Sequence, residues 1–129
     1  MSRVVVDASA VLALVLNEPG AGRVAQLIDN SIMSSVNLAE VIGYFAKAGS
    51  SVADIRPMFA ALPITILQFD IELAYEAGML RPLGETAGLS LGDRACLALA
   101  KRENAICLTA DRPWVKIASV YGVNVELIR

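Results

Sequence analysis

The chain has 129 residues, 56% of them hydrophobic, and a formal net charge of -2 at pH 7. This length suits one domain with its own core, so we expect a single domain over residues 1–129. The absence of histidine excludes His-based ribonucleases, Ser-His-Asp and Cys-His hydrolases and His-ligated zinc enzymes. The acidic balance excludes a protein that binds long nucleic acid through charge alone.

Strand and helix patterns alternate along the chain. Val4-Val5-Val6 is a β-branched run without polar alternation, which indicates a strand buried on both faces. Later apolar runs predict further strands, and stretches with apolar residues three or four apart predict helices. In chain order we expect a strand at 4–6, helices at 8–16 and 21–28, a weak strand at 31–34, helices at 36–48 and 52–62, a strand at 64–67, a helix at 70–80, a loop at 81–91, a helix at 92–103, and strands at 105–108 and 123–128.

This order of elements predicts an α/β sandwich built on a largely parallel sheet of about five strands. In sheets of this kind, functional sites lie beyond the carboxyl ends of the strands. Residues that directly follow a strand are therefore the first candidates for a site.

The apolar content bears on partners and location. It exceeds the roughly 45–50% usual for a soluble domain, so part of it should form an interface with a second copy or a partner. A charged residue or a proline interrupts every apolar run well before the roughly 18 residues of a membrane helix. Cys96 and Cys107 lack disulfide or zinc spacing and lie in apolar runs, where buried thiols are expected. We expect a cytoplasmic protein with no membrane span.

Four acidic residues occupy positions where a charge needs a reason. Asp7 directly follows the first strand, and Asp111 follows the strand at 105–108. Glu40 and Asp93 lie in the first turns of otherwise apolar helices. A compact α/β fold could bring all four to the same edge of the sheet.

Helix capping explains each of these acids equally well when it is considered alone. Asp is a preferred N-cap residue, and a Ser or Asn followed three residues later by an acid matches a capping box. The corresponding caps would be Asp7, Asn37 with Glu40, Ser90 with Asp93, and Asp111.

Considered together, the acids favour a metal site. Clustered carboxylates repel one another unless a cation neutralises them, and ligands that are all oxygen point to Mg²⁺ or Mn²⁺. Ser9, Asn37 and Thr109 could support such a site by hydrogen bonding, although roles in turns fit them as well. Arg94 and Arg112 could meet phosphate groups or form surface salt bridges.

Four segments together resemble the successive motifs of PIN domains, especially those of VapC toxins. They are VVVDASA at 4–10, NLAEV at 37–41, LSLGDR at 89–94 and LTAD at 108–111. No single motif is specific, but their order and spacing cover nearly the whole chain. The resemblance implies a PIN-like α/β/α sandwich in which Asp7, Glu40 and Asp93 are the core metal-binding acids and Asp111 is a more variable fourth.

The resemblance also implies an activity and partners. These are Mg²⁺- or Mn²⁺-dependent endoribonuclease activity, a role as the toxin of a toxin-antitoxin pair, homodimerisation, and inhibition by a cognate antitoxin that occupies the active-site groove. In that family Ser9 and Thr109 match supporting polar positions.

Two other interpretations remain open from the sequence. A noncatalytic PIN-like interaction module would use the acids only as caps and the apolar surplus for assembly. A Mg²⁺-dependent phosphatase or phosphotransferase of the haloacid-dehalogenase kind also places Asp after its first strand. That family has a second Asp two residues later, where this chain has Ser9.

Overall fold

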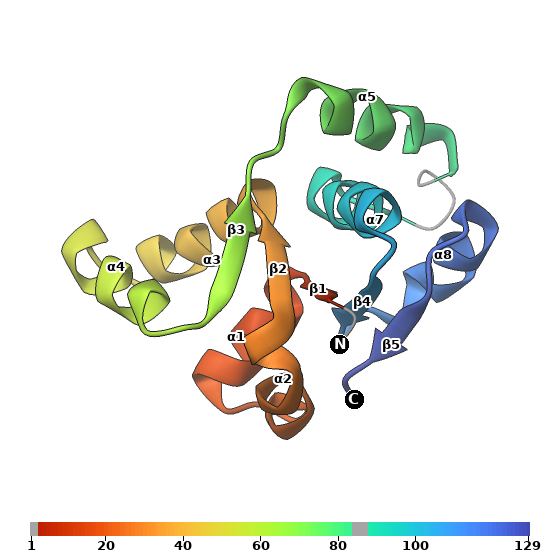
Figure 1. The fold of residues 1–129 in the computed structure, drawn as a ribbon. Helices are drawn as coiled ribbons and strands as arrows, with labels where there is room; N and C mark the ends of the chain where they lie inside the picture. Colours follow the sequence, from red (N-terminus) through yellow and green to blue (C-terminus); the bar gives the residue numbers. More distant parts are fainter. Residues whose placement is uncertain (1–2, 84–87) are drawn as a thin grey trace.

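A five-stranded parallel sheet forms the centre of the computed structural model, which describes residues 3–83 and 88–129 (Figure 1). The strand order is β3-β2-β1-β4-β5, and every neighbouring pair is parallel. The strands are β1 (Val4–Val6), β2 (Ser31–Ser34), β3 (Ile64–Leu67), β4 (Ile106–Thr109) and β5 (Val125–Leu127). The prediction of an α/β fold with a largely parallel sheet of about five strands is confirmed.

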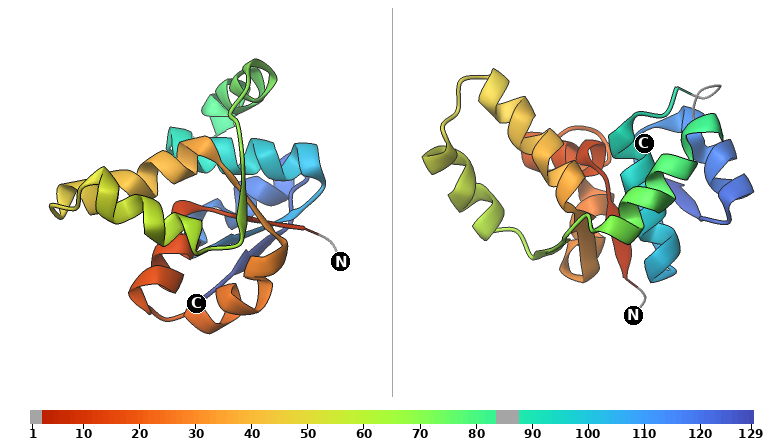
Figure 2. Two further views of the ribbon diagram at one scale, coloured as in Figure 1. Left: turned by 60° about the vertical axis from the view of Figure 1, so that its left-hand side comes forward. Right: turned by 90° about the horizontal axis from the view of Figure 1, so that it is seen from above.

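Helices cover both faces of this sheet. They are α1 (Ala8–Leu16), α2 (Ala21–Leu27), α3 (Ser35–Lys47), α4 (Val52–Ala60), α5 (Ile71–Met79), α7 (Leu91–Glu103) and α8 (Val115–Tyr121), with short 3-10 turns η1 (Ile28–Asn30) and η2 (Arg112–Trp114). The right-hand view of Figure 2 shows α1, α3 and α4 on one side of the molecule and α5, α7 and α8 on the other. This is the α/β/α arrangement that the resemblance implies.

The two apolar layers explain why the strand sequences do not alternate between polar and apolar residues. On β1, Val5 belongs to the core under α5, α7 and α8, whereas Val4 and Val6 belong to the core under α1, α2 and α3. On β4, Cys107 and Leu108 divide between the same two cores. Successive side chains point to opposite faces, so a strand covered on both sides must be apolar at every position.

The strand order creates a crevice site beside β1. The chain passes from β1 to β2 on one side, and β4 pairs with β1 on the other side. Connections therefore leave the carboxyl ends of β1 and β4 in different directions, which opens space for a ligand between them. Asp7 and Asp111 follow these two strands.

Most boundaries agree with the sequence patterns, but the expected order of elements contains no helix at 115–121, where α8 lies, and one further segment differs. The elements at 8–16, 31–34 and 64–67 have the predicted bounds. Part of the predicted loop at 81–91 is different, because residues 81–83 are helical, while 84–87 lie outside the described residues. Pro82 favoured a loop, but proline is tolerated in the first turn of a helix, where its missing N–H has no partner to lose.

Two further expectations can be compared with the described residues. Across 3–83 and 88–129, no helix has the length and apolar character needed to cross a membrane. Cys96 and Cys107 are free and fully buried, with their sulfur atoms 3.5 Å apart. The prediction of buried thiols is confirmed.

Candidate functional site

A pocket of about 280 Å³ lies beyond the carboxyl ends of β1 and β4. All four acids singled out in the sequence line it, together with two of the three supporting polar residues. The lining residues are Asp7, Ala8, Ser9, Leu12, Asn37, Glu40, Ser90, Asp93 and Asp111. Segments far apart in the sequence thus contribute carboxylates to a single pocket.

Asp7 is the deepest of these acids, with only 3% of its surface exposed. It is the N-cap of α1, because its Oδ1 accepts the main-chain N–H of Ala10 at 2.9 Å. Burial raises its pKa from 3.8 to about 6, although hydrogen bonds from Thr109, Ser9 and Ala10 oppose the shift. The capping interpretation is therefore correct for Asp7. A cap needs no burial, however, so capping does not explain why the pKa of Asp7 is raised.

Two hydroxyl groups hold the Asp7 carboxylate in place. Ser9 Oγ donates to Oδ1 at 2.7 Å, and Thr109 Oγ1 donates to Oδ2 at 2.5 Å. The same hydroxyls accept the main-chain N–H groups of Ala110 and Asp111. Thr109 is fully buried beneath the pocket rather than lining it. Ser9 and Thr109 therefore couple the end of β1 to the segment that carries Asp111.

Glu40 reaches the pocket from α3, and the capping box proposed for it with Asn37 is wrong. The N-cap of α3 is Ser34, which places Asn37 inside the helix. Asn37 Nδ2 instead donates to Glu40 Oε1 at 2.8 Å and to the main-chain oxygen of Gly92 at 3.1 Å. Partial burial raises the pKa of Glu40, the Asn37 hydrogen bond opposes this, and the charges of Asp93 and Asp111 raise it further.

Asp93 belongs to a capping box at the start of α7, as the sequence indicated. Ser90 N donates to Asp93 Oδ2 at 2.9 Å, and Asp93 N donates to Ser90 Oγ at 3.2 Å. The chain contains a second capping box of the same type, formed by Ser51 and Asp54 on α4. The two boxes therefore allow a comparison of otherwise equivalent carboxylates.

The pKa values of the two capping-box acids shift in opposite directions. The exposed Asp54 has a lowered pKa, because the Ser51 main chain and side chain stabilise its charge. Asp93 has a raised pKa, because burial outweighs the same two hydrogen bonds and the charge of Asp111 adds to it. Capping by itself lowers the pKa, so the raised value reflects the pocket.

Asp111 completes the group at the pocket mouth, where it is exposed. It occupies the N-cap position of η2, but its side chain makes no capping hydrogen bond. Its charge raises the pKa of Asp7, Glu40 and Asp93. The capping interpretation therefore fails for Asp111. The negative charge of this residue instead acts on the other three acids of the pocket.

The arginines that follow two of the acids bind main-chain oxygens. Arg94 Nη1 donates to Ala77 O at 3.1 Å, and Arg112 Nη2 donates to Arg129 O at 2.9 Å. Neither side chain lines the pocket. Among the described residues that line the pocket with the four carboxylates, there is thus no Lys or Arg.

The donor chemistry of this pocket fits a hard divalent cation. It offers carboxylate oxygens with raised pKa values, and the buried Oδ1 of Asn37 has no hydrogen-bond partner. Within 3–83 and 88–129, no three acidic or thiol side chains converge closely enough to form a ligand group as they stand. Asp7, Glu40 and Asp93 each accept a hydrogen bond from a neighbouring donor, which fixes the orientation of the three carboxylates.

Gly92 was the residue that the sequence reasoning missed. The sequence pattern shows Gly92 only as a member of the segment LSLGDR at 89–94, whereas in the structure its backbone lies directly against the Glu40 carboxylate. A glycine in the first turn of a helix, next to a candidate ligand, was the available signal.

Comparisons with known proteins support an assignment by family. A family model described as the PIN domain matches residues 4–120. A sequence comparison with curated proteins finds no match. Three solved structures are similar over almost their full length. A toxin-antitoxin complex from Klebsiella pneumoniae has a TM-score of 0.72 and 16% identity, with 98% of each chain covered. VapBC2 from Rickettsia felis bound to a promoter DNA fragment has a TM-score of 0.70 and 20% identity, with 96% of this chain and 97% of that chain covered, and FitAcB from Neisseria gonorrhoeae has a TM-score of 0.68 and 22% identity, with 95% of each chain covered.

At these identities the structural likeness shows a shared fold. The family model adds the sequence-level match, and it spans nearly the same region as the four motif segments that resemble PIN domains. The chain belongs to the PIN domain family.

Proposed function

We propose that this chain is a metal-dependent endoribonuclease and the toxin of a VapC-type toxin-antitoxin pair, acting in the cytoplasm as a single PIN domain over residues 1–129. The observation that carries the proposal is the convergence of four acids on one pocket at the crevice beside β1. Three of the four carboxylates have raised pKa values there, which means that the pocket disfavours their charged forms. Helix capping does not require such an arrangement.

The four acids Asp7, Glu40, Asp93 and Asp111 would hold Mg²⁺ or Mn²⁺. When bound, such an ion stabilises charge on a phosphate and makes water a better nucleophile near neutral pH. The chain itself supplies orientation: Ser9 and Thr109 fix Asp7, Asn37 fixes Glu40, and the main-chain N–H of Ser90 fixes Asp93.

RNA is the substrate we propose on grounds of charge and shape. The chain has a net charge of -2, which does not favour binding of long duplexes through charge alone. An exposed loop of a structured RNA places one phosphodiester near a small acidic pocket and needs few other contacts.

We expect RNA cleavage by the purified protein to require Mg²⁺ or Mn²⁺, to stop in excess chelator, and to return when the ion is restored. The same titration, followed by thermal melting without RNA, should raise the melting temperature, because binding to the folded state alone stabilises it. Undiminished cleavage in excess chelator would exclude the metal mechanism. Absence of both cleavage and a melting shift would favour the noncatalytic interaction module.

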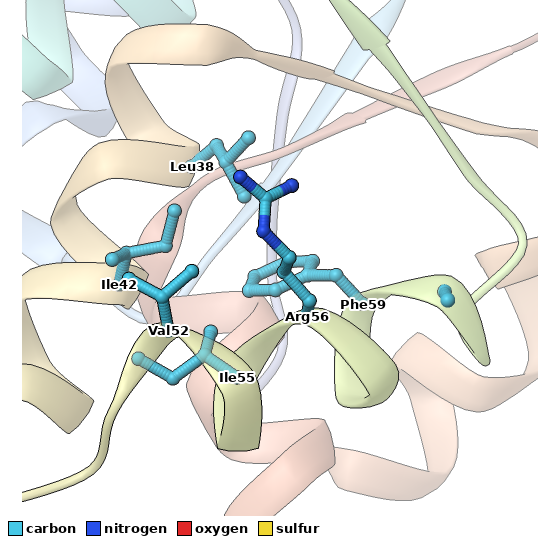
Figure 3. A pocket seen from close by; sticks show the side chains of 7 residues that line it. Leu38, Ile42, Val52, Ile55, Arg56 and Phe59 are labelled. Atoms are coloured by element: carbon cyan, nitrogen blue, oxygen red, sulfur yellow. The ribbon is translucent and has the colours of Figure 1, made fainter.

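A cognate antitoxin is the partner we propose, with an apolar and partly basic segment. Its basic part would complement the acidic pocket. Its apolar part has a candidate binding site in a groove of about 480 Å³ between α3 and α4. Figure 3 shows Ile42, Val52 and Ile55 along this groove, and Arg56 reaching across it towards Leu38. The similar structure from Klebsiella pneumoniae is itself a toxin-antitoxin complex.

A homodimer is also part of the proposal, and α5 offers the surface for it. Ile71, Tyr75 and Met79 follow one another at four-residue spacing and are 74%, 70% and 77% exposed. Residues four apart share one face of a helix, so these three form an apolar stripe. Isolated exposed apolar residues are ordinary, but a continuous stripe is typical of an interface.

We expect the wild-type protein to be a dimer at roughly tens of micromolar, and Tyr75→Lys to make it a monomer, because a charge in the centre of the stripe must be desolvated on association. Light scattering measures the mass directly. Val120→Lys is the matched control, since Val120 is 73% exposed on α8 and lies outside the stripe. A monomeric wild type would exclude the dimer, and a dimeric Tyr75→Lys variant would exclude this stripe.

A further inference from the structure

The Glu40 carboxylate rests on the first turn of α7 at a position where no side chain is present. Gly92 is buried there, and a Cβ added to it would overlap with Cδ, Oε1 and Oε2 of Glu40. The backbone of Gly92 does not adopt a positive φ, unlike that of Gly20 or Gly122. Glycine is therefore needed at this position for space rather than for backbone conformation.

Asn37 holds the same carboxylate by a hydrogen bond. Its Nδ2 donates to Glu40 Oε1 and to Gly92 O, so one amide group connects the acid to the residue on which it rests. Because both partners are acceptors, they fix the orientation of the amide. Asn37 is 1% exposed and its Oδ1 has no hydrogen-bond partner, which is a cost that a purely structural side chain would avoid.

We propose that Gly92 is a positioning residue, whose missing side chain forms the seat that keeps the Glu40 carboxylate in the acidic pocket. The role in metal binding rests on the proposed function, whereas the seat itself depends only on packing. Glu40 is the acid with the longest side chain in the pocket and the only one on α3. Without the seat, the flexible end of Glu40 is the group that must move.

The central variant is Gly92→Ala. We expect its Mn²⁺ affinity, measured by the thermal shift of the protein without RNA, to fall about ten- to a hundredfold, as when the support of a metal ligand is lost. Its metal-free melting temperature should not fall, because alanine favours helix more than glycine and the group it displaces is a side-chain end. A loss of affinity without a loss of stability separates positioning from folding.

Gly22→Ala is the matched control. Gly22 occupies the second position of α2, as Gly92 does in α7, and a Cβ added there meets no atom within 4 Å. This variant should keep the wild-type Mn²⁺ affinity. Any general effect of placing alanine in the first turn of a helix will appear in it.

Shortening the displaced side chain provides a rescue. Aspartate at position 40 is one methylene shorter, so Gly92→Ala combined with Glu40→Asp should bind Mn²⁺ more tightly than Gly92→Ala alone. Glu40→Asp in the wild-type background should weaken binding, because the carboxylate then no longer reaches its seat. Opposite effects of one substitution in the two backgrounds would identify a steric relation between positions 40 and 92.

The side-chain amide of Asn37 gives a readout that needs no metal. In the metal-free protein its NMR resonances should move in Gly92→Ala, because Glu40 leaves its hydrogen bond, and should stay in place in Gly22→Ala. Unchanged Asn37 resonances together with unchanged Mn²⁺ affinity would overturn the proposal. If the wild type binds neither Mg²⁺ nor Mn²⁺ but the Asn37 resonances move, the seat stands and the proposed nuclease function fails.

Discussion

Asp93→Asn is expected to lower metal-dependent RNA cleavage by at least about a hundredfold while leaving the metal-free protein no less stable than the wild type. The amide keeps an oxygen that can accept the Ser90 N–H, so the capping box at the start of α7 survives. What disappears is a partly buried charge whose pKa is raised by burial and by Asp111. Cleavage rates and melting temperatures measure the two effects separately.

The second capping box supplies the control for this variant. Asp54→Asn makes the same chemical change in the same local geometry on α4, but at an exposed site with a lowered pKa. It should leave cleavage unchanged and lower stability slightly. Ser90→Ala should cost about 1 kcal/mol as a lost cap and retain most activity. Full activity of Asp93→Asn with a destabilised fold would mean that Asp93 is only a cap.

Asp7→Asn is expected to lower metal-dependent RNA cleavage as much as Asp93→Asn does, by at least about a hundredfold. It should also raise the stability of the metal-free protein at pH 8. The pKa of Asp7 is raised from 3.8 to about 6, which corresponds to about 3 kcal/mol against the buried charge. Asparagine removes that cost but loses the hydrogen bond from Thr109, and this loss reduces the gain in stability by about 1 kcal/mol. A net gain of about 2 kcal/mol in the free energy of unfolding should remain.

The stability gain should depend on pH in a defined way. The folded state binds the Asp7 proton more tightly than the unfolded state, so the contribution of Asp7 to stability falls as pH rises from 3.8 to about 6. The extra stability of Asp7→Asn over the wild type should therefore be absent near pH 3.8 and complete above about pH 6. Denaturant unfolding in chelator across this range measures it.

Asp70 is the matched control for this pH profile. It is also an N-cap aspartate that accepts the N–H three residues ahead, at 2.9 Å from Leu73. Its pKa is lowered, first by that hydrogen bond and then by Arg102. Its contribution is therefore present at neutral pH and lost as pH falls below its usual pKa, so Asp70→Asn should be less stable than wild type at pH 8. The same slope in both variants would contradict the burial argument for Asp7.

The order of elements could be predicted from the sequence because it depends on local patterns. Valine runs buried on both faces, apolar residues at helix spacing and Ser-x-x-Asp caps are all readable within a few residues. They led to the parallel sheet, to the bounds of α1, β2 and β3, and to the N-cap at Asp70. The helical residues 81–83 were missed because Pro82 is compatible with both a loop and a first helical turn.

The sequence by itself determined which residues were candidates for the site, but it left capping and metal binding equally open. Asp54 and Asp93 have the same local pattern, so no local rule can distinguish them. The tertiary structure separates the two acids by their burial and the direction of their pKa shifts, because only the packing of α3 and α7 beside β1 sets the burial and the neighbouring charges of Asp93. The Gly92 seat for Glu40 was invisible for the same reason: it is a contact between two helices, and its function is the space left by an absent side chain.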